Sequence, residues 1–113
     1  MTIQYNKLFE AVQLGAAAAT IYTMPTTPAA IICPNMQLRL TNTAAAIRSA
    51  TLYAVPLAGA AADTNTFLSA FSLAVGESIE VNVPTLKAGD FIQGLASVAT
   101  SINVQFLSGV LRS

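Results

Sequence analysis

Apolar and polar residues alternate with a period of two in three separate segments of this chain. The alternation covers residues 36–41, 79–83 and 102–106. Successive side chains of a β-strand point to opposite faces, so each segment predicts a strand with one apolar face and one polar face. Strands of this kind occur in sheets that cover a core on one side and meet water on the other. The sequence therefore predicts an all-β fold.

Residues typical of turns separate about eight apolar segments along the chain. We expect strands at Leu8–Leu14, Thr20–Met24, Ala29–Leu40, Ala50–Pro56, Thr66–Leu73, Ser78–Val83, Phe91–Leu95 and Ile102–Leu111. The long third segment should bend or break at Pro34, which has no backbone N–H to donate. This spacing predicts a single-domain β-sandwich of two four-stranded sheets, jelly-roll or Greek-key like. We expect residues 8–113 to form the sandwich, and residues 1–7 to form an N-terminal arm that lies against a neighbouring subunit or the coat of a larger assembly.

Three alanine clusters, Ala16–Ala19, Ala44–Ala46 and Ala60–Ala62, favour helix by intrinsic propensity. Each cluster is far shorter than the roughly 12 residues that an isolated helix needs to be marginally stable. We therefore expect loops there, with a single helical turn at most.

The composition indicates a surface that is poorly protected against association. Charged residues make up 9% of the chain, hydrophobic residues 54%, and the net charge is zero. A typical soluble domain carries about 25% charged residues, and charge is what keeps proteins apart in solution. Self-association is therefore expected. The five basic residues are scattered, so we expect no nucleic-acid partner, because phosphate binding needs a concentrated positive field.

Two long uncharged stretches, residues 11–38 and 91–111, are interrupted by prolines and polar side chains. A spanning helix needs about 20 predominantly apolar residues, so we expect no membrane partner. The polar first ten residues lack the apolar segment of a secretory leader, and none is expected.

The chain contains no histidine, which removes the commonest general base and metal ligand. Its five carboxylates are Glu10, Asp63, Glu77, Glu80 and Asp90. None forms an evident pair across a cleft, and a D-x-N pattern at Asp63 and Asn65 is only a fragment of a calcium loop. Gly76, Gly89 and Gly94 are too far apart for a phosphate loop and indicate turns or bulges. We therefore expect no enzyme activity, and no catalytic, cofactor-binding or metal-binding residues.

The single cysteine, Cys33, lies in an apolar segment and is expected to be a small core residue. A disulfide-linked dimer is the alternative. Tyr22 and Tyr53 fall in expected strands, at the edge of the core. An exposed cluster of both with Tyr5 would instead indicate a carbohydrate- or receptor-binding surface.

Several phrases, taken in order, resemble a group of small virion proteins of tailed bacteriophages. They are Ile21–Pro25, Leu40–Thr43, Leu52–Pro56 followed by Ala58 and Gly59, Leu73–Glu80, and Leu86–Gly94. They correspond to a strand ending in Val-Pro, an Asn-Thr turn, a Gly-Glu hairpin turn and an Ala-Gly-Asp entry into the next strand. The resemblance extends from about Leu8 to Gly109.

The resemblance implies a β-sandwich on the phage particle, and a head decoration (cement) protein on the outer capsid surface in particular. Its partners would be the major capsid protein and copies of itself, as a homotrimer at three-fold positions. It would be made in the bacterial host cytoplasm and reside in the virion. The alternative is a tail or fibre component that binds a receptor or a carbohydrate. The resemblance brings no catalytic or ligand-binding residue.

Overall fold

The computed structural model describes residues 3–4 and 7–112 of the chain. The strands in chain order are β1 Ile3–Gln4, β2 Val12–Gln13, β3 Ala19–Thr23, β4 Ile32–Cys33, β5 Met36–Asn42, β6 Arg48–Val55, β7 Thr66–Leu73, β8 Ser78–Val83, β9 Leu86–Lys87, β10 Phe91–Ala96, β11 Ile102–Ser108 and β12 Leu111–Arg112. A single 3₁₀ turn, η1, covers Asp63–Asn65. The described residues contain no α-helix.

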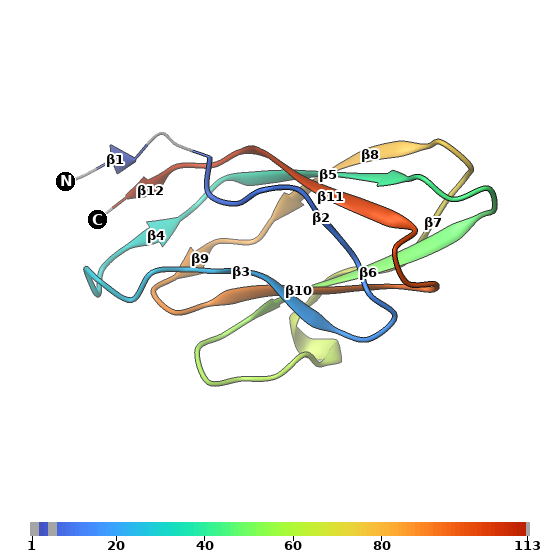
Figure 1. Ribbon diagram of the computed structural model, residues 1–113. Helices are drawn as coiled ribbons and strands as arrows, with labels where there is room; N and C mark the ends of the chain where they lie inside the picture. Colours follow the sequence, from blue (N-terminus) through green and yellow to red (C-terminus); the bar gives the residue numbers. More distant parts are fainter. Residues whose placement is uncertain (1–2, 5–6, 113) are drawn as a thin grey trace.

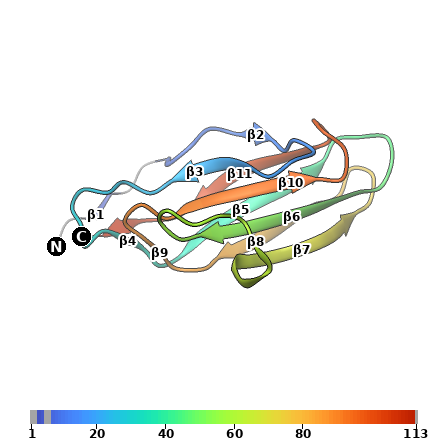
Figure 2. The same ribbon diagram turned by 90° about the horizontal axis from the view of Figure 1, so that it is seen from below.

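Two four-stranded antiparallel sheets face each other (Figures 1 and 2). The β5 sheet has the order β2-β11-β5-β8, and the β6 sheet has the order β3-β10-β6-β7. The connections from β2 to β3, β5 to β6, β7 to β8 and β10 to β11 each cross from one sheet to the other. This order is the double Greek key of a jelly roll. The predicted β-sandwich is confirmed.

The core lies between these two sheets because the alternating apolar residues point inward. Along β5, Met36, Leu38 and Leu40 are almost fully buried, whereas Gln37 and Arg39 are exposed. The same alternation holds at β8 and at the start of β11. The pattern read from the sequence therefore identifies the inward face of these strands correctly.

A third, smaller sheet of order β1-β12-β4-β9 joins both ends of the described chain at one end of the sandwich (Figure 1). The Ala29–Leu40 segment breaks at Pro34, as expected, into β4 and β5. The Ile102–Leu111 segment also divides, into β11 and β12. The short strand β9 was not expected. Within the stretch predicted to be an arm, Ile3–Gln4 pair with β12, residues 1–2 and 5–6 lie outside the described residues, and the arm stays a prediction.

The expected strand at Leu8–Leu14 is much shorter in the structure, where only Val12–Gln13 pair, with β11. The apolar residues before it close one side of the core instead. The Phe9 ring stacks on Tyr22, with ring centroids 5.4 Å apart, and meets Phe106 edge-on at 5.6 Å. This apolar segment therefore covers one side of the core, and most of it does not pair as a β-strand.

The alanine clusters lie in connections, as predicted. Ala16–Ala18 precede β3, and Ala44–Ala46 join β5 to β6. The third cluster, Ala60–Ala62, leads directly into η1, the one helical turn among the described residues. No helix of the described chain is long and apolar enough to span a membrane.

Candidate functional site

The carboxylates are dispersed over the described part of the molecule. Glu10 pairs with Lys7, Glu80 approaches Arg39 on the exposed face of the β5 sheet, and Glu77 accepts a hydrogen bond from the Ala74 N–H. Within the described residues no three His, Cys, Asp or Glu side chains gather in a way that could hold a metal ion.

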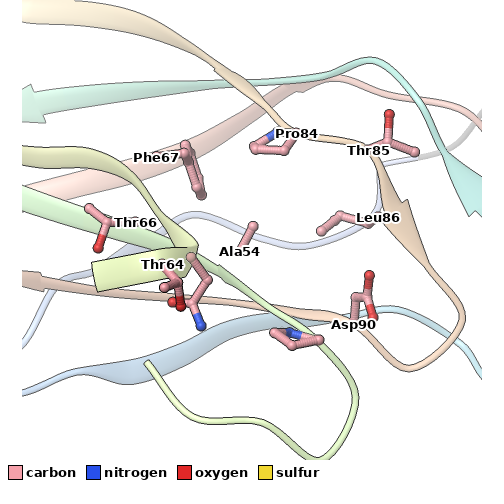
Figure 3. Close-up of a pocket in the computed structure, with 10 residues that line it drawn as sticks. Ala54, Thr64, Thr66, Phe67, Pro84, Thr85, Leu86 and Asp90 are labelled. Carbon is pink, nitrogen blue, oxygen red and sulfur yellow. The ribbon is translucent and has the colours of Figure 1, made fainter. Parts of the chain in front are cut away.

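An open pocket of about 240 Å³ lies where the connection from β6 to β7 meets the segment from β8 to β10 (Figure 3). Phe67 and the threonines 64 and 66 line one side, and Pro84, Thr85 and Leu86 line the other. Asp90 is the one carboxylate that lines this pocket, and its oxygens already accept hydrogen bonds from backbone N–H groups of the adjacent turn.

Asp90 accepts hydrogen bonds from the backbone N–H of Leu57 at 3.2 Å and of Lys87 at 2.9 Å. The Asp90 N–H in turn donates to the Lys87 carbonyl, and Gly89 adopts a positive φ of 82°. Asp90 therefore caps a turn, the structural role expected of this residue type. The pocket offers an apolar wall and hydroxyl groups.

Cys33 is completely buried in the core. Burial raises the pKa of its thiol, opposed in part by backbone hydrogen bonds from Val110 and Asn35. A buried thiol with a raised pKa forms little thiolate, the species that attacks disulfides. The expectation of a core cysteine is confirmed, and this burial opposes the alternative of a disulfide-linked dimer.

We expect Cys33 in the native protein to react with a chromogenic disulfide reagent at least about a hundred-fold more slowly than in denaturant, because reaction requires an opening of the core. The rate of colour development at pH 7 measures this. As a control, a Cys33→Ala, Ser72→Cys double variant moves the thiol to an exposed strand position and should react at once. Equal rates for native and unfolded wild-type protein would show that Cys33 is accessible.

Tyr22 and Tyr53 lie on opposite faces of the β6 sheet. Tyr22 is paired with the buried Ile92, and burial raises the pKa of its phenol, with a smaller contribution from the charge of the nearby Cys33 thiolate. Tyr53 is paired with Gln93, which faces outward. Tyr5 lies outside the described residues. The two described tyrosines therefore do not form the cluster that would indicate carbohydrate binding.

The outer face of the β6 sheet, which we call the uncharged face, has no acidic or basic side chain at its centre. Its central residues are Thr51, Tyr53, Gln93 and Leu95, which pair across β6 and β10 and are all half-buried. The Gln93 amide donates to the Thr20 hydroxyl at 3.3 Å, which extends the face to β3. Arg48 is the only charged residue in the four strands of this sheet, all of which lie in the described chain. Such a face suits close contact with another protein surface, because no charge has to lose its water.

The outer face of the β5 sheet has a different character. Three cross-strand pairs connect β5 to β8: Gln37–Asn82 at 3.0 Å, Arg39–Glu80 at 3.9 Å and Thr41–Ser78 at 2.9 Å. All of these contacts are exposed, so this face satisfies its own polar groups and is compatible with water. The two outer faces of the sandwich are thus chemically unequal.

A second candidate surface, the loop end, lies at the end of the sandwich away from the termini (Figures 1 and 2). Exposed apolar side chains stand in three of its connections: Ile47 before β6, Val75 between β7 and β8, and Val98 between β10 and β11, with exposed fractions of 66%, 59% and 46%. Isolated exposed apolar residues are ordinary, but several on adjoining loops indicate an interaction surface.

Asn42, the last residue of β5, holds the loop end together. It is fully buried, and its amide nitrogen lies 2.9, 3.0 and 3.2 Å from the carbonyl oxygens of Ala46, Leu73 and Ala74. Its side-chain oxygen accepts from the Ala44 N–H at 2.9 Å. The sequence pattern predicts a turn at this residue but does not indicate its buried role. The Asn-Thr pair ahead of the alanines was the available signal.

No protein-family model matches the chain, and a search of curated proteins finds no match. Solved structures with a similar fold include a subunit described under Bacillus endospore appendages that form a family of disulfide-linked pili. It shares 19% identity at a TM-score of 0.59, over 99% of this chain and 88% of that one.

The subviral particle of infectious bursal disease virus protein VP2 is also similar, at 13% identity and a TM-score of 0.51. A second structure from the same virus, of the Gt strain, gives 12% and 0.50. Both alignments cover 97% of this chain, which spans only about a third of the viral chains, 32% and 30%. At such identities the likeness establishes the fold, a β-sandwich that occurs in subunits of particles and appendages.

Proposed function

We propose that this chain is a structural protein of a tailed-bacteriophage virion that binds the outer capsid surface and stabilises the head. The uncharged face of the β6 sheet carries this proposal, because a face without charged side chains at its centre suits close contact with another protein. The major capsid protein is the proposed partner, and the proposed state is a homotrimer. The protein acts by binding and not as an enzyme. It is made in the host cytoplasm and resides on the capsid.

The mechanism follows from the geometry of a shell. Packed DNA pushes coat subunits apart, and a protein that bridges neighbouring subunits opposes their separation. A trimer at a three-fold position contacts several coat subunits at once, so modest individual contacts add to a strong attachment. The uncharged centre of the β6 sheet provides such a contact without desolvating a charge.

A second candidate is a subunit of a self-assembling filament, favoured by the likeness to the endospore pilus subunit across almost the whole chain. That pilus is described as disulfide-linked. A linear polymer joined by disulfides needs two cysteines per subunit, whereas these 113 residues contain one, Cys33, which is buried. A filament of this chain would have to be held by non-covalent contacts. The receptor-binding alternative receives no support from the arrangement of Tyr22 and Tyr53.

Phage particles that lack the protein are expected to release their DNA at a lower temperature, because a ligand that binds only the intact shell stabilises it. Adding purified protein should restore the wild-type midpoint and saturate at a fixed number of copies per coat subunit. DNA release on a temperature ramp, followed with an intercalating dye, measures both effects.

Matched variants connect this experiment to the uncharged face. Leu95→Glu places a charge at its centre and should abolish restoration, whereas Gln105→Glu places the same charge on the outer face of the β5 sheet and should restore fully. Particles that keep full heat resistance without the protein, but lose adsorption to cells, would refute capsid decoration in favour of the fibre alternative.

A further inference from the structure

Arg48 lies at the loop end without a carboxylate partner among the described residues. Its Nη1 donates to the Ile47 carbonyl at 3.0 Å, while its Nε is buried and has no acceptor in the described chain. A guanidinium carries five N–H donors, and those of Arg48 that neither bind Ile47 nor belong to the buried Nε are left for a second molecule. Exposed Ile47, Val75 and Val98 stand on the same end. An arginine among apolar side chains is a typical energetic centre of a protein interface.

The connection from β6 to β7, residues 56–65, has the complementary composition. It carries Leu57, which is 63% exposed, followed by small residues and the exposed Asp63 at the start of η1. The Asp63 carboxylate forms no ion pair within the described residues. This segment therefore presents an exposed apolar side chain and one unpaired negative charge.

The other carboxylates are already engaged within the described chain, whereas the cations Lys87 and Arg112 form no ion pair there. Lys7 pairs with Glu10 at 3.2 Å and Arg39 with Glu80 at 3.9 Å, and the Asp90 carboxylate caps its turn. Asp63 is thus the carboxylate without a partner among the described residues, and it shares the 56–65 segment with the exposed Leu57. Of the three cations without an ion pair there, Arg48 is the one at the loop end, beside exposed apolar side chains. Arg48 is the first residue of β6, and Asp63 lies in the connection that follows the last residue of that strand, Val55.

We propose that the loop end of one copy of this chain binds the 56–65 segment of the next copy, with Arg48 against the partner's Asp63 and with Ile47, Val75 and Val98 around the partner's Leu57. The inference deepens the proposed function, on which it rests, by specifying how the subunits associate. The loop end also carries Glu77, whose carboxylate accepts a hydrogen bond from the Ala74 N–H. The unpaired Arg48 at one surface and the unpaired Asp63 at the other select a second copy of this chain as the occupant, since contact between like surfaces would bring two Arg48 or two Asp63 side chains together.

The geometry makes this contact head-to-tail. Strand β6 runs from the loop end to the 56–65 segment (Figure 2), and its eight residues separate the two surfaces by roughly 26 Å at about 3.3 Å per residue. A contact between two different surfaces generates a ring if the rotation closes and a filament if it does not. Closure after three copies gives the proposed homotrimer.

Two variants that block opposite surfaces test the polarity. Ile47→Asp blocks the loop end and Leu57→Asp blocks the 56–65 segment, and both positions are exposed enough for the fold to tolerate the change. The wild type at micromolar concentration should exceed the 11.7 kDa mass of one chain by a factor of three for a closed ring. Each variant alone should be a monomer by light scattering. Mixed in equal amounts, the two should form a dimer and nothing larger, because each supplies the one surface that the other lacks.

Charge reversal tests the ion pair. Arg48→Glu and Asp63→Arg should each weaken association at least about tenfold, and the double variant should recover wild-type association. Gln105→Glu, which changes the charge at neither surface, should associate normally. Circular dichroism checks that every variant keeps the β fold.

A wild-type protein that stays monomeric at 100 micromolar would overturn the inference, as would a mixture of the two blocked variants that contains no dimer. Self-association of Leu57→Asp alone would also overturn it, by showing contact between like surfaces. The proposed capsid binding is judged separately. A monomer that restores the heat resistance of particles refutes head-to-tail association alone, whereas an associating protein that never restores it refutes capsid decoration alone.

Discussion

Replacing Asn42 with alanine is expected to lower the free energy of unfolding by about 3–5 kcal/mol. The substitution removes the donor to the carbonyls of Ala46, Leu73 and Ala74, and the acceptor for the Ala44 N–H. A buried polar group left without a partner costs about 1–3 kcal/mol, and the protein loses several partners at once. Denaturant titration followed by circular dichroism measures the change.

Asn82→Ala is the matched control for this experiment. Asn82 makes one exposed hydrogen bond, from the amide of Gln37 at 3.0 Å, and its loss should cost no more than about 0.5 kcal/mol. If Asn42→Ala unfolds within 1 kcal/mol of the wild type, Asn42 does not hold the loop end together. The loop end would then owe its shape to backbone hydrogen bonds alone.

A second large effect is expected in the core at Gly94. A Cβ atom there would lie 2.7 Å from Leu52 Cδ2 and 3.0 Å from both Ile21 Cδ1 and Leu14 Cδ2. Gly94→Ala should therefore destabilise by about 1–3 kcal/mol through overpacking. Leu52→Ala should cost about 2–5 kcal/mol through the cavity it leaves. In the double variant the new methyl group occupies part of that cavity, so the combined loss should fall short of the sum by at least about 0.5 kcal/mol.

Gly15→Ala provides the control for the glycine substitution. The nearest atom to a Cβ at Gly15 is the Ala17 carbonyl oxygen, at 3.8 Å, an ordinary contact distance. This variant should unfold within about 0.5 kcal/mol of the wild type. Strict additivity of Gly94→Ala and Leu52→Ala would contradict the close packing of β10 against β6 on which the expectation depends.

The sequence by itself determined the type of element and the inward face of the regular strands. Thr66–Leu73 and Ser78–Val83 were predicted with the bounds that the structure shows, and the break at Pro34 was predicted too. These successes share a cause. Alternation and turn chemistry act over a few neighbouring residues, so one sequence contains all the information that they need.

Local patterns did not determine which strands would find a partner. The Leu8–Leu14 segment is apolar enough for a strand, yet most of it covers the core without strand pairing. Its Phe9 ring stacks on Tyr22 and meets Phe106 edge-on. Strand β9 was not predicted because two residues are too few to show an alternation of apolar and polar side chains. In both cases pairing depends on residues that are distant in the sequence.

The candidate surfaces divide in the same way. Low charge and abundant alanine indicated a protein that associates, and this followed from composition alone. Only the tertiary structure decided that the β6 sheet carries an uncharged outer face, while the β5 sheet pairs its polar groups across strands. Only the tertiary structure left Arg48 and Asp63 without ion-pair partners among the described residues, and buried Asn42 between two loops. The order of the strands in the two sheets decides where these side chains lie. That order arises from long-range packing that no local pattern of residues encodes.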